Sequence, residues 1–484
     1  MFIVQALATI VVVLATIASC REVPVNKKLR AEMYGPGLVH ERIMATKHRI
    51  WGEFLRQGAF NSSQYGSFGP KKDVVQCRHG VAALVPGDPK NTFRCKNLDL
   101  YDFKTHAQLG SASGMGASIW GWTSPEGREF VAIAQEDGTA FAEVTSRGKL
   151  VYLGRLPQYG TAPKSMWREI KGYKNYVLIG SEAVRHGIQI FDMSKLLTVN
   201  PQKPVKFTNN KDLTAWWMEG LPMGKSHNVL ANEEMKYGVA TGFQPRDGSL
   251  KAGMVFFDLT DPSKPKMLGG TGVDGYVHDA QCIVYRGPDK KYYGRDICYG
   301  YDEDAFTMYV FDVTDKKNIT VISSVSYEGF AYIHQGWVLD PMWQQYLITD
   351  DEYDEYNRTG LGHDGYPVSY IWDISSLENP KQTGYYKGLR KGIDHNQYVK
   401  DGYTYQSNYG LGLSILDLRS VPMDPTGRSI REVAYFDTRP EDDNLPGGGN
   451  LTFTGSWSNY PYFNSGYILV NTLDRGVFVL KRTR

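Results

Sequence analysis

The sequence predicts an all-β fold, a seven-bladed β-propeller, and three observations lead to it. A histidine-centred triplet recurs, short strand-like runs follow each triplet, and the last unit lacks one strand that an upstream segment can supply. The triplets are, in chain order, Ser226-His227-Asn228, Val277-His278-Asp279, Ile333-His334-Gln335 and Asp394-His395-Asn396. Their spacings of 51, 56 and 61 residues have the size of a propeller blade. Only 10 of the 484 residues are His, so four in one repeat position indicate a true repeat.

The strand-like runs are clearest at the third position of each unit, where β-branched and aromatic residues end in Asp. These runs are Gly187–Asp192, Met254–Asp258, Met308–Asp312, Ser369–Asp373 and Leu413–Asp417. We assign Trp120, Trp167 and Trp457 to the histidine position of three further units. This makes seven units between about residue 98 and the C-terminus.

The last unit contains only two runs, Gly466–Val470 and Gly476–Leu480. We predict that Asn97–Asp102 supplies its missing outer strand, because pairing the two ends of the chain in one blade removes exposed sheet edges. An open solenoid is the competing architecture, and the upstream donor strand disfavours it. The propeller then spans residues 97–484 as one domain.

Composition excludes some classes of partner. The chain is 42% hydrophobic and 22% charged, as in an ordinary globular protein, and its 51 glycines suit many turns. The net charge of +2 gives no basic field of the kind that nucleic-acid binding requires. We expect a monomer with no nucleic-acid partner.

Residues 1–20 have the features of a secretory signal peptide. The run from Phe2 to Thr16 is apolar apart from Gln5 and Thr9, and charge begins at Arg21. This run is too short to span a bilayer comfortably, and no later segment is long enough for a membrane anchor. Residues 17–20 also fit a bacterial lipoprotein cleavage site, although no Lys or Arg precedes them. We therefore expect a secreted, extracellular protein, with eukaryotic secretion and bacterial lipidation both open.

Residues 21–96 form an N-terminal arm with one amphipathic helix at Leu38–Gly58. One face carries Val39, Ile43, Ile50 and Phe54, and the polar residues Glu41, Lys47, Glu53 and Arg56 lie elsewhere. We expect this helix to pack across the side or base of the propeller. A helix on a membrane surface is the alternative.

Four cysteines remain after the signal peptide, an even number that suits an oxidising compartment. Cys282 and Cys298 flank a turn at Gly287–Lys291, so an antiparallel hairpin would place them opposite each other at disulfide distance. Cys77 and Cys95 then pair by default and tie the arm to the closing strand. Buried free thiols are the alternative. Glycosylation sequons occur at Asn61, Asn318, Asn357 and Asn450.

The repeated histidines are candidate metal ligands. They open the innermost strands, so they should surround the mouth of the central channel. The loop after the second strand returns to the same mouth and is acidic in two units, at Asp302–Asp304 and Asp350–Glu355. Imidazole and carboxylate together suit Zn, Cu, Fe or Mn. The candidate ligands are His227, His278, His334, His395 and Glu352. Alternatively, each His is a structural residue that hydrogen-bonds the backbone of the next blade.

Other polar residues would line the same ligand face, namely Asp279, Asp302, Asp351 and Asn396. The run 350–355 is either a solvated loop or a Ca²⁺ site, although it lacks EF-hand spacing. We assign Trp120, Trp122, Trp167 and Trp457 to core packing. The chain has no nucleophile elbow, phosphate-binding glycine loop, HExxH motif or Rossmann fingerprint. The catalytic residues thus stay unknown, and whether the protein is an enzyme stays open.

Several motifs in combination resemble the choice-of-anchor B family, whose propellers are related to the LVIVD-repeat group. They include Ser118–Trp122, Gly127–Phe130, Asp137–Thr139, Trp167–Ile170, Tyr285–Asp289 and His334–Trp337, and the resemblance covers roughly residues 95–480. It implies a secreted or surface-attached propeller. This chain ends at Arg484 without an anchor, so we expect it to be soluble or wall-associated.

The resemblance implies no particular activity, and two hypotheses remain. The first is an extracellular binding or scaffold module that recognises a glycan, peptide or wall polymer at the channel mouth. The second is a metal-dependent oxidoreductase or hydrolase with an axial metal site.

Overall fold

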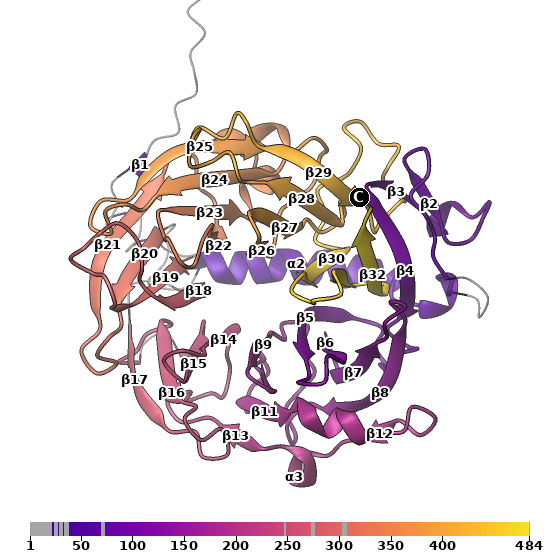
Figure 1. Cartoon of the computed structure of the whole chain (residues 1–484), viewed down its shortest axis with the longest axis horizontal. Helices are drawn as coiled ribbons and strands as arrows, with labels where there is room; N and C mark the ends of the chain where they lie inside the picture. The colour runs from indigo at the N-terminus through magenta and orange to yellow at the C-terminus, as the bar shows by residue number, and fades with distance from the viewer. Residues whose placement is uncertain are drawn as a thin grey trace, which may run out of the picture.

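The computed structural model describes residues 22–23, 28, 32, 38–68, 73–245, 248–272, 276–302 and 307–483. Seven sheets surround a central axis in these residues, which confirms the predicted seven-bladed propeller (Figure 1). The predicted signal peptide lies outside the described residues. No helix within them is long and apolar enough to cross a membrane.

The first four blades are given from the axis outward. Blade 1 contains β5 (Gly116–Thr123), β6 (Glu129–Gln135), β7 (Gly138–Val144), β8 (Leu150–Pro157) and β12 (Val205–Lys206). Blade 2 contains β9 (Ile170–Tyr173), β10 (Tyr176–Ile179), β11 (Ile188–Asp192) and β13 (Ala215–Trp217). Blade 3 contains β14 (Asn228–Asn232), β15 (Tyr237–Thr241), β16 (Met254–Asp258) and β17 (Met267–Thr271). Blade 4 contains β18 (Val277–Val284), β19 (Asp296–Asp302), β20 (Thr307–Asp312), β21 (Thr320–Tyr327) and β1 (Glu22–Val23).

The last three blades complete the ring. Blade 5 contains β22 (Ile333–Val338), β23 (Tyr346–Asp351), β24 (Val368–Asp373) and β25 (Lys381–Lys387). Blade 6 contains β26 (Gln397–Lys400), β27 (Tyr403–Ser407), β28 (Leu413–Asp417), β29 (Arg431–Phe436), β3 (Thr92–Lys96) and β2 (Val81–Ala83). Blade 7 contains β30 (Ser456–Tyr460), β31 (Tyr467–Thr472), β32 (Gly476–Arg482) and β4 (Leu98–Thr105). The helices are α2 (Leu38–Arg56), α3 (Asn209–Asp212) and α4 (Asp354–Asn357), with short 3₁₀ turns at Ser62–Gln64, Pro89–Asn91, Met193–Thr198 and Gly360–Asp364.

The ring closes as predicted, because β4 is the outer strand of the last blade. It pairs with β32 in an antiparallel register that runs from Gly476 opposite Thr105 to Arg482 opposite Leu98. Strand β4 therefore lies beside the C-terminal strand β32 (Figure 1). Apolar residues on both strands bury their side chains, and the rings of Phe103 and Phe478 lie 4.5 Å apart between centroids. This pairing covers the outer edge of β32.

The domain boundary at residue 96 needs correction. Strands β2 and β3 extend the sheet of blade 6 through β29, so residues 81–96 belong to the propeller. Cys95 accordingly lies on β3 in blade 6 and not on the closing strand β4. The pairing of β3 with β29 uses backbone atoms. The sequence pattern of this hairpin is therefore the same whether it joins blade 6 or stands alone.

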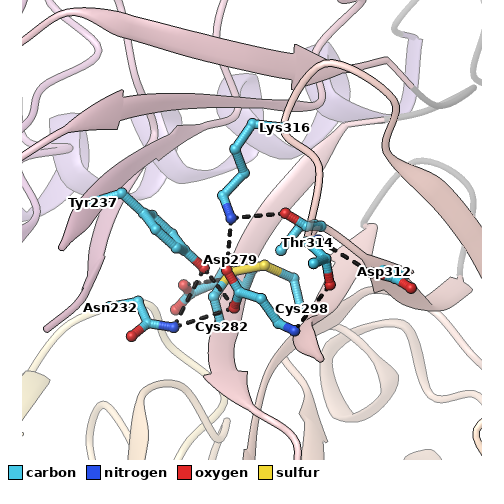
Figure 2. The surroundings of a disulfide bond; sticks show 11 residues. Asn232, Tyr237, Asp279, Cys282, Cys298, Asp312, Thr314 and Lys316 are labelled. Carbon is cyan, nitrogen blue, oxygen red and sulfur yellow. Dashed lines mark hydrogen bonds and ion pairs between the residues drawn. A yellow bond between two sulfur atoms is a disulfide. The ribbon is translucent and has the colours of Figure 1, made fainter. Parts of the chain in front are cut away.

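Both predicted disulfides, Cys77–Cys95 and Cys282–Cys298, are present. Cys282 and Cys298 are directly opposed on β18 and β19, as the hairpin argument required. Figure 2 shows this bond beside a polar contact between blades, in which Tyr237 donates to Asp296 at 2.9 Å and Lys316 binds the same carboxylate at 2.6 Å.

The repeat alignment is wrong in blade 1. A bulge at the start of the inner strand holds His278 in blade 4 and Trp457 in blade 7. In blade 1 the bulge falls at residues 117–118, so Ala117 occupies this region and Trp120 lies farther along β5. Matching the units by their aromatic residues does not reveal this bulge. A bulge shifts the register of the strand by an extra residue, and the residue types alone do not show where that extra residue falls.

Helix α2 forms where predicted but lies elsewhere on the propeller. It crosses the channel opening that carries the histidines, and not the side or base (Figure 1). Its buried residues are His40, Ile43, Lys47 and Trp51, which follow one another at helical spacing. The sequence analysis placed Lys47 on the polar face, but its ammonium is buried against Glu352. A charged residue can occupy the buried face here because an opposite charge meets it.

We predict that Phe103→Ala lowers the free energy of unfolding of the whole propeller by about 3–5 kcal/mol, because the side chain is buried where the ring closes. Lys104→Ala, on the same strand and only half-buried, is the matched control and should change stability little. Urea denaturation followed by fluorescence measures both variants. Equal stability of Phe103→Ala and the wild type would show that closure does not depend on β4.

Removing the bond between Cys282 and Cys298 by a double change to Ala should lower the free energy of unfolding by about 2–4 kcal/mol, because the loop between them gains freedom in the unfolded chain. Thermal unfolding with and without reductant provides the measurement. Reductant should destabilise the wild type more than it does the double variant, and equal sensitivity would contradict the expectation.

Candidate metal centre on the propeller axis

Four histidines from consecutive blades form a continuous arc at the axis. The ring centroids of His227 and His278 lie 4.1 Å apart, those of His278 and His334 4.1 Å, and those of His334 and His395 4.3 Å. All four side chains are buried. Each precedes or opens the innermost strand of its blade, so the radial arrangement of the blades brings together residues up to 168 positions apart in the sequence.

In three of these histidines, His227, His278 and His395, the Nδ1 atom is held by a protein acceptor. His278 Nδ1 donates to the carbonyl oxygen of His334 at 2.9 Å, and His395 Nδ1 donates to that of Trp457 at 2.6 Å. His227 Nδ1 donates to the carboxylate of Glu182. A carbonyl oxygen can only accept, which assigns the proton to Nδ1 and leaves a lone pair on Nε2 of a neutral ring. The inter-blade hydrogen bonds and a ligand role are therefore compatible, since each uses a different nitrogen.

Burial keeps three of these rings neutral. It lowers the pKa of His278, His334 and His395 well below the usual range, and Lys47 lowers each pKa further. His334 Nδ1 has no hydrogen-bond partner within the described residues and lies 3.7 Å from Asp350 Oδ1. A neutral imidazole is the form that binds a metal ion, so these rings are ready to act as ligands near neutral pH.

Glu352 lies beside the arc and is held by two further residues. Its carboxylate contacts Lys47 Nζ at 2.7 and 2.8 Å and accepts a hydrogen bond from Tyr409 at 2.5 Å. Its Oε1 is 3.8 Å from His395 Nε2. Burial raises the pKa of Tyr409 well above the usual range, so its phenol keeps the proton that it donates. Within the described residues, His334, Glu352 and His395 form the one set of three donor atoms that lie within 4.8 Å of one another.

Lys47 and Tyr409 are the site residues that the sequence analysis missed. Lys47 lies midway between Ile43 and Trp51 at spacings of four, which places all three on one helix face. Tyr409 follows β27 as Glu352 follows β23, so the loop after the second strand supplies both residues.

The other predicted ligand-face residues do not form a solvent-facing surface, because all four are buried. Asp351 accepts backbone hydrogen bonds from Ala331 and Tyr332, and Asp302 accepts one from Tyr276. Asp279 accepts from Gln335, and Asn396 donates to the Trp457 carbonyl. These side chains satisfy buried backbone and amide groups, a need that sequence patterns do not reveal.

The acidic run 350–355 is not a solvated loop, since its carboxylates are buried. Burial raises the pKa of Asp350, Asp354 and Glu355 well above the usual range. The donor atoms of His334, Glu352 and His395 lie within 4.8 Å of one another, and no three of the carboxylates in this run do so within the described residues. They therefore do not form a Ca²⁺ site by this measure. Residues 303 and 304 of the other acidic loop lie outside the described residues.

The predicted core tryptophans lie in two separate places, and the predicted glycosylation sites lie on the surface. Trp167 and Trp457 are buried and pack near Trp51 of α2, with ring centroids 5.0 and 6.3 Å away. Trp120 and Trp122 are half-buried and line a cavity at the other end of the channel. The four sequons, Asn61, Asn318, Asn357 and Asn450, are all exposed, and glycosylation stays a prediction.

A cavity of about 560 Å³ lies between α2 and blades 1 to 3. It is lined by Trp51, Trp167 and Glu182, and the last of these binds His227. Glu182 also accepts from the hydroxyl of Tyr276 at 3.0 Å. Burial alone would raise the pKa of Glu182, but His227 and its hydrogen bond lower it to about 2, so the carboxylate is charged. This cavity reaches the His227 end of the arc from the side of the helix.

No protein-family model matches the chain, and no curated protein matches it. Two of the solved structures with a similar fold have low sequence identity to this chain. Hydrazine synthase from Kuenenia stuttgartiensis has a TM-score of 0.47 at 13% identity, over 77% of this chain and 98% of that one. The computationally designed Ika8 protein has a TM-score of 0.45 at 10% identity, over 87% of this chain and 99% of that one. The assignment of the fold rests on the sheet topology of this chain itself.

Proposed function

We propose that the axial histidines hold one divalent transition-metal ion and that the protein is a secreted metal-dependent oxidoreductase. The observation that carries the proposal is the arc of four buried imidazoles, three of which have Nδ1 tied to a protein acceptor. Such second contacts orient a ring and fix its tautomer in metal sites. An ion at this place would be bound by His334, His395 and Glu352, with His278 and His227 continuing the arc. Imidazole-rich donor sets suit Fe, Cu and Zn.

The state of the nearby carboxylates favours redox chemistry over hydrolysis. A metal-dependent hydrolase needs a free base to take a proton from the attacking water. Glu352 is engaged by Lys47 and Tyr409, and Glu182 is engaged by His227 and Tyr276. Both carboxylates are therefore already engaged by neighbouring side chains. A substrate in the cavity under α2 would meet the His227 end of the arc, because Glu182 lines that cavity and binds His227.

A binding or scaffold module is the second candidate, and one observation favours it. The ammonium of Lys47 already provides Glu352 with a positive partner, so the carboxylate is satisfied by the chain itself. The axis would then be a structural hub, and the histidines would serve through their inter-blade hydrogen bonds. The two disulfides support an oxidising compartment for either candidate. The resemblance to choice-of-anchor B propellers also supports secretion.

We predict that purified protein contains about one equivalent of Fe, Cu or another first-row transition metal, measured by elemental analysis. His334→Ala and His395→Ala should each lower metal occupancy at least tenfold, because each removes a ligand. His106→Ala is the matched control, since His106 is equally buried but binds the Thr472 carbonyl in blade 7. It should reduce thermal stability and leave the metal content unchanged. Metal-free protein that also gains no thermal stability from added Fe²⁺, Cu²⁺, Zn²⁺ or Mn²⁺ would favour the binding module.

We also predict that Lys47 and the metal compete for Glu352. Without metal, Lys47→Met should lower the free energy of unfolding by about 3–5 kcal/mol, because a buried carboxylate loses its partner. Added metal should restore much of this loss and bind the variant more tightly than the wild type. Arg49→Met, at an exposed position of the same helix, should behave like the wild type. Titration of each apoprotein measures both effects, and equal metal affinity of Lys47→Met and the wild type would exclude Glu352 as a ligand.

A further inference from the structure

A second cavity, of about 610 Å³, lies at the opposite end of the channel. Each of the seven innermost strands contributes to it, with residues farther along the strand than the histidine position. On β22, for example, Trp337 lines the cavity three residues after His334. Three residues of strand span about 10 Å, so the cavity is separate from the histidine arc. Its volume is typical of sites for small organic ligands.

Aromatic side chains form much of the cavity wall. Trp120, Trp122 and Trp337 are half-buried and contribute indole surface to it. Their positions are fixed by neighbouring rings, since Trp120 lies 5.3 Å from Tyr460 and Trp337 lies 5.3 Å from Tyr398, both edge to face. Because neighbouring rings hold these indoles in place, the cavity wall keeps its shape without a ligand. A wall of rigid indoles suits a flat partner, because an indole face packs against another ring or against the apolar face of a sugar.

The same cavity contains one buried cation, Lys171 on β9. Its side chain is buried, and Nζ donates one hydrogen bond, to the hydroxyl of Tyr398 at 3.0 Å. Nζ also lies 5.4 Å from the ring centroid of Trp120. Among the described residues it forms no ion pair within 4.0 Å. An ammonium has three N–H donors, so two of them have no protein acceptor among these residues.

The charge on Lys171 is kept despite its surroundings. Burial alone would lower its pKa, but Tyr398, Asp279 and Glu169 together raise it above the usual value. Burial raises the pKa of Asp279, whose Oδ2 is already bound by Gln335. A buried ammonium with unused donors is unfavourable unless an acceptor reaches it. Lys171 disfavours a cationic ligand beside it because the two like charges repel, and the other charged lining residues, Lys174 and Glu233, are exposed.

We propose that this cavity binds a small molecule with a carboxylate attached to a ring that has an apolar face. The carboxylate accepts hydrogen bonds from Lys171, and the ring packs against Trp120 and Trp337. Carboxylate supplies the acceptors and the negative charge that Lys171 lacks, and such charge-assisted hydrogen bonds are the strong ones. Aromatic acids and uronic-acid sugars share this chemistry. The proposal does not depend on the metal centre, because it uses none of the axial histidines.

Binding is tested by titration of the full chain with two matched pairs of probes, followed by tryptophan fluorescence and calorimetry. The first pair is indole-3-acetate and its neutral amide, and the second is trigalacturonate and its methyl ester. At least one acid should bind saturably, and its neutral partner should bind about 10–100-fold more weakly, because it loses the hydrogen bonds to a charged group. The pair that responds identifies the source of the ligand. These comparisons use the wild type, so they do not depend on the folding of a variant.

Lys171→Met should lower affinity for the acid by the same factor, whereas Lys206→Met, at an exposed position on β12, should bind like the wild type. Treatment with a chelator should leave binding unchanged, which separates this site from the metal centre. The proposal is overturned if neither acid binds saturably, if acid and neutral partner bind equally, or if Lys171→Met binds like the wild type.

Discussion

The pairing of β4 with β32 is the contact on which the rest of the molecule depends. It joins β4, which precedes blade 1 in the sequence, to β32, the last strand of the chain, and so closes the ring of seven sheets. Closure sets the direction in which every inner strand points, and the starts of four of these strands bring His227, His278, His334 and His395 to one axis. The same constraint places the later residues of all seven inner strands around the cavity at the other end. Both proposed sites are therefore consequences of ring closure.

A buried ion pair connects the N-terminal helix to this axis. Lys47 brings a positive charge to Glu352 at a place where neither charge reaches solvent. Removing two charges from water is costly, and only close contact with hydrogen bonds offsets the cost. Tyr409 supplies the additional hydrogen bond. The pair thus holds α2 over the histidines and leaves the cavity beside the helix as the way to reach them. Any cation bound there would share the carboxylate of Glu352 with Lys47.

The two ends of the channel differ in chemistry because different strand positions reach them. Neutral imidazoles and a carboxylate collect at the start of the inner strands, where an added cation is favoured. Indole rings and one buried ammonium collect farther along, where an anion with an apolar ring is favoured. Between them, Asp279, Gln335, Asp350 and Gln397 form a chain of buried hydrogen bonds. This polar layer separates the ends and rigidifies the inner strands.

The sequence by itself determined the features that depend on local repeats. The strand periodicity and the spacing of the histidines predicted seven blades, the closing strand and the pairing of Cys282 with Cys298, because each follows from register within a blade. Only the tertiary structure decided what lies across blades. It placed Lys47 on the buried face of α2, moved Trp120 from the histidine position to the far cavity, and isolated Lys171 among aromatic rings. These positions depend on bulges and on which charges meet after closure, and such long-range encounters leave no periodic trace in a single chain.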